Sequence, residues 1–485
     1  MFPKNIHIQV AITTIAQKYQ LPGVFYLDLW PVAPRILVIT DPDIARKYTV
    51  LHNLPKHPEE AKALDSVIGS LNMVSANGQA WKRSHAIVAP AFGESQVKSL
   101  VPIISGEIMT FRQILFEKAA AGKPFELEDV VGRAAFDIIC TTIFGFSLDG
   151  QRKGNLILDG FTALTNNWPL ERDTWNPITK RSSRIAREAN HKKIDVYVEK
   201  LIRERFDILH RDNIDVSKKR GLIIMDLLLR DRFQESKSAG KTPSEALDAD
   251  FINLVITNIK TLLLAGTGTI TDTVCFAYML LSANPDCVAK LREEHDRVFG
   301  PDIESAVAQL QENPSKINEL EYTTNVLKET LRMFPIGNTA RSPLPERDGD
   351  FIEWNGIQYP TKDMMVTPVQ HAMHMDSKTF SNPGTFDPDR FTRDDFPRHA
   401  WRPFERGPRA CTGQVMAMDE MKAFLLFTVR DFDWECHDLK PFEKPAVGWW
   451  DLDTVFGARA YQEYVFEAKP RDGMPVVFKK RSKDE

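Results

Sequence analysis

The sequence predicts a mainly α-helical fold with a small β-rich region. Helical periodicity dominates the chain, and its longest apolar stretch runs from Phe251 to Leu281. Strand signals are few and short: Arg35–Ile39 is one, and Phe351–Pro360 predicts a hairpin that turns at Asn355-Gly356. No clear linker, internal repeat or low-complexity tract divides the 485 residues, so a single domain spanning residues 1–485 is expected.

The remaining elements follow in chain order. Asp41 and Pro42 open a helix after the first strand, because aspartate is a favoured N-cap and proline suits the first helical turn. An apolar helix is predicted at Arg133–Phe144, an exposed helix at Lys192–Leu209 and an amphipathic helix at Gln414–Phe427. Two polar, Ser- and Lys-rich segments predict mobile surface loops at Arg211–Lys219 and Gln234–Ala246.

Composition limits the classes of function. A hydrophobic content of 43% is enough for a large core, and the net charge of −4 gives no basic signal for nucleic acid. The five cysteines form no C-x-x-C pair, which indicates a reducing compartment without structural disulfides. The first sixteen residues contain neither the apolar run of a membrane span nor a signal-peptide core, so no N-terminal anchor is expected in this chain.

One cysteine lies in a glycine-bounded loop, Phe404–Gly413, directly before a helix. Glycine lets the backbone approach a flat ligand closely, and the free N–H groups of the following helix point toward the sulfur. The free N–H groups and the positive dipole end of this helix are expected to lower the pKa of the Cys411 thiol and to favour the thiolate that ligates metal. The alternative is that Cys411 is only a small buried residue.

This loop resembles the haem-binding loop of the cytochrome P-450 superfamily, F-x-x-G-x-R-x-C-x-G. Every fixed position is matched, by Phe404, Gly407, Arg409, Cys411 and Gly413. The resemblance implies haem b with Cys411 as the axial thiolate ligand and Arg409 paired with a haem carboxylate. It also implies the fold of that superfamily, of eukaryotic microsomal type and in the style of fungal members.

A helical segment supplies a second motif. Glu329 and Arg332 are three residues apart on one helix face and can pair, which by itself is usually surface decoration. With Pro388-Asp389-Arg390-Phe391 further on, the segment resembles the superfamily's E-x-x-R helix and its partner loop. The resemblance implies a buried structural triad of Glu329, Arg332 and Arg390.

The long apolar helix contains Ala265-Gly266-Thr267-Gly268-Thr269 at its middle. Glycine costs about 1 kcal/mol against alanine inside a helix, so two of them indicate close ligand approach, a local distortion, or packing of small residues against another helix. The pattern resembles the superfamily's A-G-x-(acid)-T motif, which implies that Ala265 and Gly266 border dioxygen and that Thr269 guides protons to it. Gly268 replaces the acid, which leaves the proton relay open. Water in the space beside Gly268 and a substrate hydroxyl are the alternatives, whereas the register of Asp272 does not fit the motif.

A fourth segment, Gly78–Phe92, resembles the helix whose W-x-x-x-R pair contacts a haem propionate. Trp81 matches, whereas His85 stands at the arginine position, so its pairing would be weaker and dependent on pH. Arg341 and Arg409 are firmer propionate partners, because a guanidinium can engage a carboxylate with two hydrogen bonds.

Together the resemblance implies a monooxygenase that activates dioxygen and hydroxylates or epoxidises a small hydrophobic substrate in fungal secondary metabolism. Because no flavin or nicotinamide motif is present, electrons are expected from a separate NADPH-cytochrome reductase, with cytochrome b5 as a second donor. A monomer that binds no nucleic acid is expected, at the cytosolic face of the endoplasmic reticulum by resemblance, or in the cytoplasm. The alternatives are a haem-thiolate isomerase, dehydratase or peroxide-driven enzyme, and a non-catalytic haem-binding protein.

Position in the superfamily also suggests two surfaces. The substrate pocket is expected to be lined by five segments, namely Leu64–Val74, Phe161–Pro177, Leu262–Thr269, Ile336–Thr339 and Trp450–Phe456. A reductase-docking face is expected from a basic cluster near the cysteine loop, formed by Lys82, Arg83, Arg402, Arg406 and Lys422. An ordinary solvated basic face is the alternative.

Overall fold

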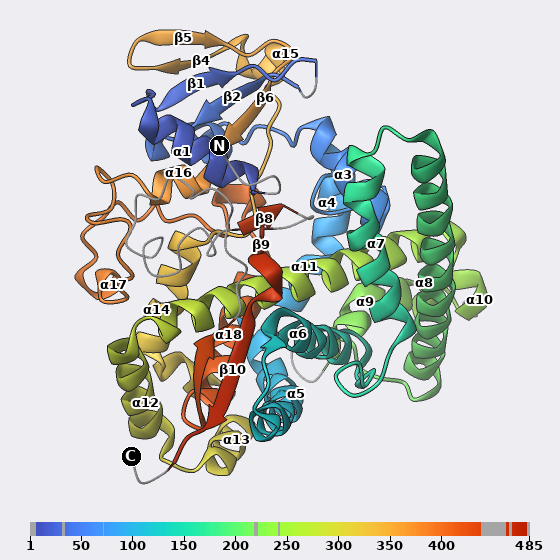
Figure 1. Cartoon of the computed structure of the whole chain (residues 1–485). Helices are drawn as coiled ribbons and strands as arrows, with labels where there is room; N and C mark the ends of the chain where they lie inside the picture. The colour runs from blue at the N-terminus through green and yellow to red at the C-terminus, as the bar shows by residue number, and fades with distance from the viewer. Residues whose placement is uncertain are drawn as a thin grey trace.

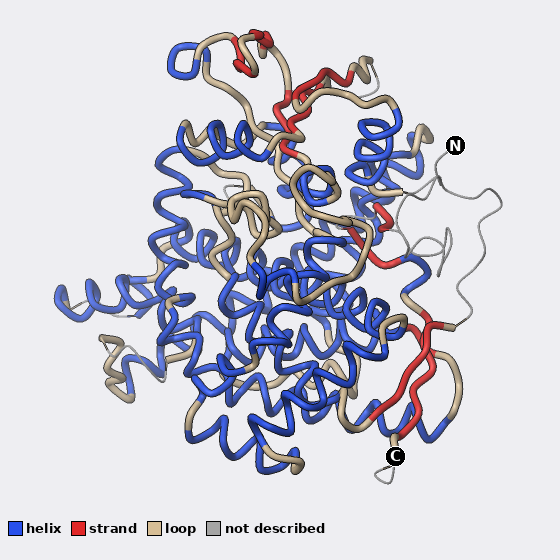
Figure 2. The backbone as a smooth tube through the Cα atoms, turned by 90° about the vertical axis from the view of Figure 1, so that its left-hand side faces the viewer, coloured by secondary structure: helices blue, strands red, loops and turns tan. Residues whose placement is uncertain are grey.

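The long helix α11 (Ala249–Ser282) crosses the centre of the molecule in the computed structural model, with the other helices around it and small sheets at its edges (Figure 1). The structure describes residues 6–31, 34–70, 72–217, 222–240, 243–437, 462–464 and 468–482. The mainly α-helical prediction with a small β-rich region is confirmed, and Figure 2 shows how few of the described segments are strands.

The other helices of the described residues are α1 (Ile8–Lys18), α2 (Pro42–Arg46), α3 (Pro58–Ile68), α4 (Gly78–Val88), α5 (Glu94–Ala121), α6 (Leu127–Phe144), α7 (Leu156–Asp173), α8 (Pro177–Arg211), α9 (Ile224–Ala239), α10 (Pro243–Ala246), α12 (Pro285–Phe299), α13 (Ile303–Glu312), α14 (Glu321–Met333), α15 (Pro345–Asp348), α16 (Gln370–His374), α17 (Arg390–Arg393) and α18 (Gln414–Thr428). The strands are β1 (Val24–Leu27), β2 (Ile36–Ile39), β3 (Phe125–Glu126), β4 (Phe351–Trp354), β5 (Ile357–Pro360), β6 (Met365–Pro368), β7 (Phe432–Cys436), β8 (Gln462–Tyr464), β9 (Ala468–Pro470) and β10 (Pro475–Lys480).

The largest β-region forms one end of the molecule, at the top of Figure 1. β2 lies between β1 and β6, antiparallel to the first and parallel to the second, and β4 pairs with β5 as a separate hairpin. Asn355 and Gly356 have φ values of 49° and 74°, the left-handed conformation that a two-residue hairpin turn requires. Asp41 caps α2 by accepting from the Asp43 and Ile44 N–H groups. The predicted first strand, helix start and hairpin are therefore confirmed.

The hydrophobic core surrounds α11, which packs against α6, α14 and α18. Phe276 of α11 stacks on Phe334 beyond α14 at a ring-centroid distance of 4.4 Å, and Tyr278 shares a buried hydrogen bond with Thr428 of α18. By length and apolar composition α11 could cross a membrane, but its residues from Ile270 to Leu281 are buried inside the protein. Within the described residues α11 is thus the central core helix.

Two sequence expectations differ from the structure. The loop predicted at Gln234–Ala246 is wrong, because α9 continues to Ala239 and ends only at Gly240, whose φ is 64°. Phe233 and Ser236 are buried on one face of α9, and this tertiary packing outweighs the polar composition that favoured a loop. The pair of glycines in α11 does not interrupt the helix, which is continuous from Ala249 to Ser282.

Candidate functional site

A cavity of about 350 Å³ lies between the middle of α11 and the cysteine loop that precedes α18. It gathers most of the residues that the sequence motifs single out, from three separate segments. These residues are Ala265, Gly266 and Thr269 of α11, Trp81 and His85 of α4, and Phe404, Arg409, Cys411 and Gly413 of the loop. Gly407 and Arg341 lie just outside this lining.

The cysteine loop is held by its own backbone. The Cys411 N–H donates to the Phe404 carbonyl at 2.8 Å, and the Ala410 N–H donates to the Gly407 carbonyl at 3.0 Å. Gly407 has a φ of 79°, and a Cβ there would lie 3.0 Å from the Cα of Val50, so only glycine suits this position. The loop therefore holds the cysteine at a fixed place on the cavity wall.

The Cys411 side chain is exposed within the cavity, while protein surrounds the loop. Burial raises the pKa of the thiol above its usual value, and the Gly413 N–H, which donates to the sulfur, lowers it only in part. The expectation that the loop alone lowers this pKa is therefore wrong. Deprotonation depends on the cation that the sulfur would ligate, since a coordinating thiol loses its proton outright.

The opposite wall of the cavity is the small-residue segment of α11. The Thr269 hydroxyl donates to the Ala265 carbonyl at 2.7 Å, which fixes its orientation. A Cβ on Gly266 would lie 2.9 Å from Ile139 of α6, so this glycine also permits close packing of two helices. Gly266 thus borders the cavity, where a ligand could approach closely, and it also packs against α6. These are two of the explanations for the glycine that the sequence left open.

The rim of the cavity carries two arginines, of which Arg409 is partly buried and Arg341 is fully buried. Arg409 donates to the Val74 and Ala76 carbonyls at 3.0 and 2.9 Å, and its guanidinium lies 4.8 Å from the ring centroid of Trp81. Arg341 is fully buried and donates to the Leu54 carbonyl, whereas its Nε and Nη2 have no hydrogen-bond partner among the described residues. Burial lowers the pKa of Arg409 to about 10, and Arg341 nearby adds to the effect.

Lys56 is a member of this rim that the sequence did not reveal. It lines the cavity, is 8% exposed, and pairs with Glu60 at 2.6 Å and with the Thr339 hydroxyl at 2.7 Å. Burial lowers its pKa, Glu60 opposes the shift, and Arg341 and Arg409 add to it. The segment around Lys56 has no recognisable motif, so only the fold brings it to the cavity.

Two more predicted positions have clear partners. The rings of Trp81 and His85 lie 4.9 Å apart, both at the cavity.

Glu420 of α18 also lines the cavity, is 2% exposed, and was not anticipated from the sequence. Burial raises the pKa of the Glu420 carboxyl group well above its usual value, because a buried carboxylate loses its hydration.

Glu329, Arg332 and Arg390 form a cluster that is at most 1% exposed. Both oxygens of Glu329 accept from Arg332 at 2.8 Å, and Arg390 donates to one of them at 3.4 Å. Arg332 also donates to the carbonyl of His374, whose Nε2 accepts from the Arg402 N–H at 3.1 Å. The cluster is therefore connected by hydrogen bonds to the start of the cysteine loop.

The predicted basic face is only partly present. Lys82 and Arg83 are exposed, but Arg402 and Lys422 are buried, at 1% and 5% exposed. Arg402 donates to Thr49 and Glu405, and Lys422 pairs with Asp419 at 2.9 Å, so both are structural charges. Including these two residues in an exposed docking face was therefore wrong.

The predicted pocket segments also divide. Met73, Val74 and the Leu262–Thr269 and Ile336–Thr339 segments contribute to the cavity. Phe161–Thr165, by contrast, lies at a different cavity on the other side of α11. Trp450–Phe456 lies outside the described residues. Fewer of the predicted segments therefore line this cavity than the sequence suggested.

Comparison with known proteins identifies relatives along nearly the whole chain. Cytochrome P450 monooxygenase acrF of Aspergillus aculeatus is 29% identical, over 98% of this chain and 97% of the relative. Cytochrome P450 monooxygenase polC of Polytolypa hystricis is 28% identical, over 98% of this chain and 84% of the relative.

The fold has a counterpart among solved structures. The crystal structure of the cytochrome P450DA heme domain matches 99% of this chain and 94% of that chain, with a TM-score of 0.75 and 19% identity. The sequence model of the family described as Cytochrome P450 matches residues 4–452. With a cysteine loop, a threonine-bearing central helix and a cationic rim around one cavity, the chain belongs to the cytochrome P450 family of monooxygenases.

Proposed function

We propose that the chain is a haem-thiolate monooxygenase in which the Cys411 thiolate would bind the iron of haem b. The observation that supports this most is that Cys411 and Thr269 line one cavity, from the loop before α18 and from α11. Haem, when bound there, would supply the activation of dioxygen and the oxidation of a C–H bond. The residues of the chain bind it, orient the substrate and handle protons.

The cavity fits the cofactor in charge. Haem has an apolar ring and two carboxylates, and the rim supplies Lys56, Arg341 and Arg409 beside largely apolar walls. The unpartnered nitrogens of the buried Arg341 favour an anionic partner, because a buried donor left without an acceptor is costly. We assign the carboxylates to these three residues, with Trp81 and His85 alongside them and with Phe404, Gly407 and Gly413 shaping the proximal loop.

The remainder of the cavity suits a small hydrophobic substrate. Leu262 and Ile336 present apolar side chains to it, and Asn338 offers one exposed amide that can orient a polar group of the substrate. Thr269, on the same wall as Ala265 and Gly266, is positioned to hold a proton at its hydroxyl oxygen. The relatives of this chain include fungal monooxygenases, which supports a substrate from fungal secondary metabolism.

Electrons would come from NADPH-cytochrome reductase, with cytochrome b5 as a second donor, at the cytosolic face of the endoplasmic reticulum. The exposed Lys82 and Arg83 of α4 are next to Trp81 and so lie close to the cavity. They offer a positive surface for an acidic partner. Lys82→Glu should slow reduction by the reductase and weaken its salt dependence, measured by stopped-flow, while cofactor content stays normal.

The decisive experiment supplies the haem-loaded protein with ¹⁸O₂, NADPH and reductase, and a panel of small terpenoid, polyketide and alkaloid compounds. One ¹⁸O atom in the product supports monooxygenation. Ile336→Ala and Asn338→Ala should change the position of oxidation. Product formation that requires only peroxide, or neither peroxide nor NADPH, would instead indicate a peroxide-driven enzyme or an isomerase. Haem binding without turnover would contradict an enzymatic role.

A further inference from the structure

The segment Pro335–Thr339 forms part of the wall of the Cys411 cavity and has no regular secondary structure. All of Ile336–Thr339 line the cavity. Among the described residues no backbone–backbone hydrogen bond holds this segment: the last one before it is donated by the Phe334 N–H, and the next one reaches the Ala340 carbonyl. The position of the segment therefore depends on side-chain contacts and on how its two ends are held.

The end at Thr339 is held by residues around the start of α3. Lys56 donates to the Thr339 hydroxyl at 2.7 Å, and the Ala340 N–H donates to the Glu60 carboxylate at 3.0 Å. The Ala340 carbonyl accepts from the His57 N–H at 3.0 Å. Three hydrogen bonds thus fix the chain where it leaves the cavity.

The other end is held at a single atom, the carbonyl oxygen of Pro335. The Gln9 side chain donates to this oxygen at 2.6 Å and the Gln462 side chain at 3.0 Å. Gln9 also donates to the amide oxygen of Gln462 at 2.9 Å, and the two glutamines are 1% and 0% exposed. Because proline has no N–H group, the carbonyl is the only backbone group through which Pro335 can form a hydrogen bond.

The two glutamines come from elements that are far apart in the sequence but adjacent in the fold. Gln9 lies in α1 and Gln462 in β8 (Figure 1). The His7 N–H donates to the Gln462 carbonyl at 2.8 Å, and the His7 ring lies 5.2 Å from the ring of Tyr464. The start of α1 is therefore fixed to β8, and the two elements act on Pro335 together.

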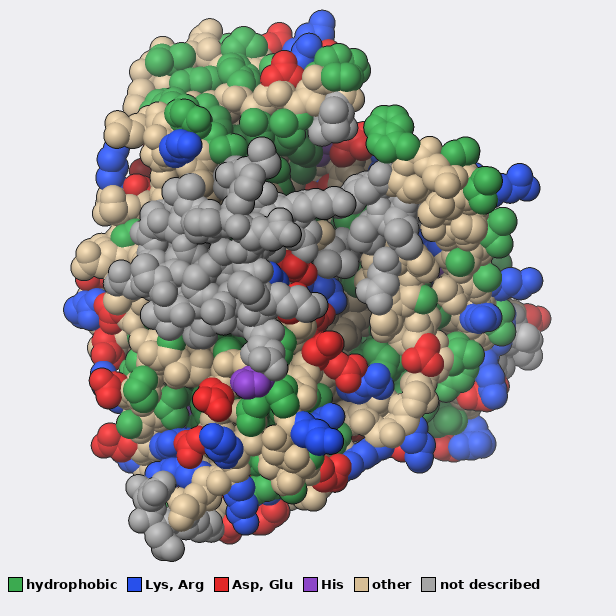
Figure 3. Space-filling model, in the orientation of Figure 1, with side chains coloured by type: hydrophobic (Ala, Val, Ile, Leu, Met, Phe, Trp, Pro, Cys, Tyr) green, Lys and Arg blue, Asp and Glu red, His purple; other side chains and the backbone are tan. Residues whose placement is uncertain are grey.

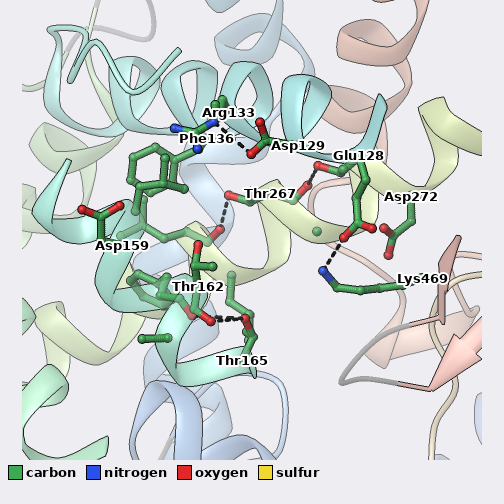
Figure 4. A pocket seen from close by; sticks show the side chains of 18 of the residues that line it. Glu128, Asp129, Arg133, Phe136, Asp159, Thr162, Thr165, Thr267, Asp272 and Lys469 are labelled. Carbon is green, nitrogen blue, oxygen red and sulfur yellow. Dashed lines mark hydrogen bonds and ion pairs between the residues drawn. The ribbon is translucent and has the colours of Figure 1, made fainter. Parts of the chain in front are cut away.

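β8 is itself anchored through its partner strand β9, in which Pro470 pairs with Gln462. Lys469 of β9 pairs with Glu128 of α6 at 2.5 Å, beside a cavity of about 570 Å³ on the other side of α11. Acidic side chains border a hollow in this region (Figure 3), and Figure 4 shows Lys469 pointing toward Glu128. Both side chains are about a quarter exposed or less, so this partly buried pair limits movement of the hairpin that carries Gln462.

We propose that Gln9 and Gln462 are positioning residues for the oxidation, which fix the Pro335 carbonyl and thereby hold Ile336 and Asn338 in place beside the substrate. The proposal rests on the proposed function and extends it to two residues outside the cavity lining. A segment fixed at only one end samples several conformations, and the affinity of a ligand falls in proportion to the fraction that can bind it. The two glutamines therefore act on how the substrate is bound and oriented, and not on how haem is held.

The test compares two haem ligands, imidazole and 4-phenylimidazole, by spectral titration of the haem-loaded protein. Imidazole is small, whereas the phenyl group of the larger ligand needs an ordered cavity wall. Gln9→Met combined with Gln462→Met keeps unbranched side chains of similar size and removes both donors to the Pro335 carbonyl. This double variant should bind 4-phenylimidazole at least about fivefold more weakly, the equivalent of one lost hydrogen bond, and should bind imidazole normally.

The single variants test whether the two glutamines share one acceptor. In Gln9→Met or Gln462→Met the carbonyl keeps one donor, so each should weaken 4-phenylimidazole binding only about twofold, and the double variant should exceed the product of the two. Gln96→Met is the matched control, because Gln96 of α5 is 5% exposed and also donates at 2.6 Å to a distant carbonyl, that of Leu222. It should leave the binding of both ligands unchanged.

Distinct results would overturn the proposal. Unchanged binding of 4-phenylimidazole in the double variant, or equal weakening of both ligands, would show that the glutamines do not position the wall. Weakening in Gln96→Met as large as in Gln9→Met would show a general effect of losing a buried hydrogen bond, and this comparison decides the question if the double variant does not fold. If the wild-type protein gives no spectral response to either ligand, the haem assignment of the proposed function fails, and the positioning role falls with it.

Discussion

Replacing Glu329 by alanine tests how far the buried cluster stabilises the fold. Four N–H groups donate to this carboxylate: two from Arg332 at 2.8 Å, one from Arg390 at 3.4 Å and the backbone N–H of Asp387 at 3.1 Å. All three charged side chains are at most 1% exposed, so the substitution leaves two buried guanidinium groups without a counter-charge. Breaking a buried pair in this way costs about 3–5 kcal/mol.

The hydrogen bonds that Arg332 and Arg390 keep limit the loss of unfolding free energy. Arg332 keeps the His374 carbonyl at 2.9 Å, and Arg390 keeps the Ser381 carbonyl at 2.7 Å. We therefore expect a loss of about 4 kcal/mol in the free energy of unfolding, because partial solvation by these carbonyls offsets the upper end of the range. Glu329→Gln keeps the volume and removes the charge, so it should show most of the same loss.

Denaturant unfolding monitored by tryptophan fluorescence, together with haem content per chain, measures the effect. Glu199→Ala is the control, since Glu199 pairs with Arg203 on the surface of α8, where both side chains are about two-fifths exposed or more. Such a pair contributes about 0.5 kcal/mol or less. We expect both Glu329 variants to lose haem incorporation and the control to keep a normal haem content. A change below about 1 kcal/mol, with normal haem content, would refute a structural role for the cluster.

Three further predictions concern single groups. Cys411→Ala should abolish the thiolate-type Soret band of the reduced, CO-bound protein, and a retained band would reject the ligand assignment. Burial raises the native pKa of Glu420, so the contribution of this carboxyl group to stability is present below its unfolded pKa and is lost as pH rises. Glu420→Gln cannot ionise and should therefore gain stability over the wild type between pH 5 and 8, measured by urea unfolding. Burial lowers the native pKa of His7 to about 4, and of His295 and His371 to about 3, so their contributions are present above pH 6.5 and are lost as pH falls. From pH 8 to pH 5.5 each should cost about 1.4 kcal/mol, which a pH series of unfolding curves checks, and a flat series would contradict it.

Local chemistry was readable from the sequence wherever a residue determines its own backbone. Asp41 before Pro42, and Asn355 with Gly356, specify a helix start and a hairpin turn through nearest neighbours, and the structure agrees. The end of α9 was not readable, because burial of Phe233 against distant helices keeps a polar segment helical.

The candidate site shows the same division. The motif residues of the cysteine loop lie together because they are close in sequence, and Thr269 lines the same cavity as Cys411. Lys56 and Glu420 could not be anticipated, since their presence at the cavity depends on how distant segments pack. The burial of Arg402, which looks like a surface charge in the sequence, depends on its contacts with Thr49 and Glu405.

The hydrogen bonds of His374 have a consequence for how the cofactor is loaded. Its Nε2 accepts from the Arg402 N–H, so Nδ1 carries the proton and donates to the Arg332 carbonyl at 3.0 Å. One neutral tautomer thus ties α14 to the residues that lead into the cysteine loop. A loop already ordered by such contacts loses little conformational entropy when its ligand arrives. Haem would therefore enter a preformed receptacle, and its affinity would reflect contacts made and not a loop to be folded.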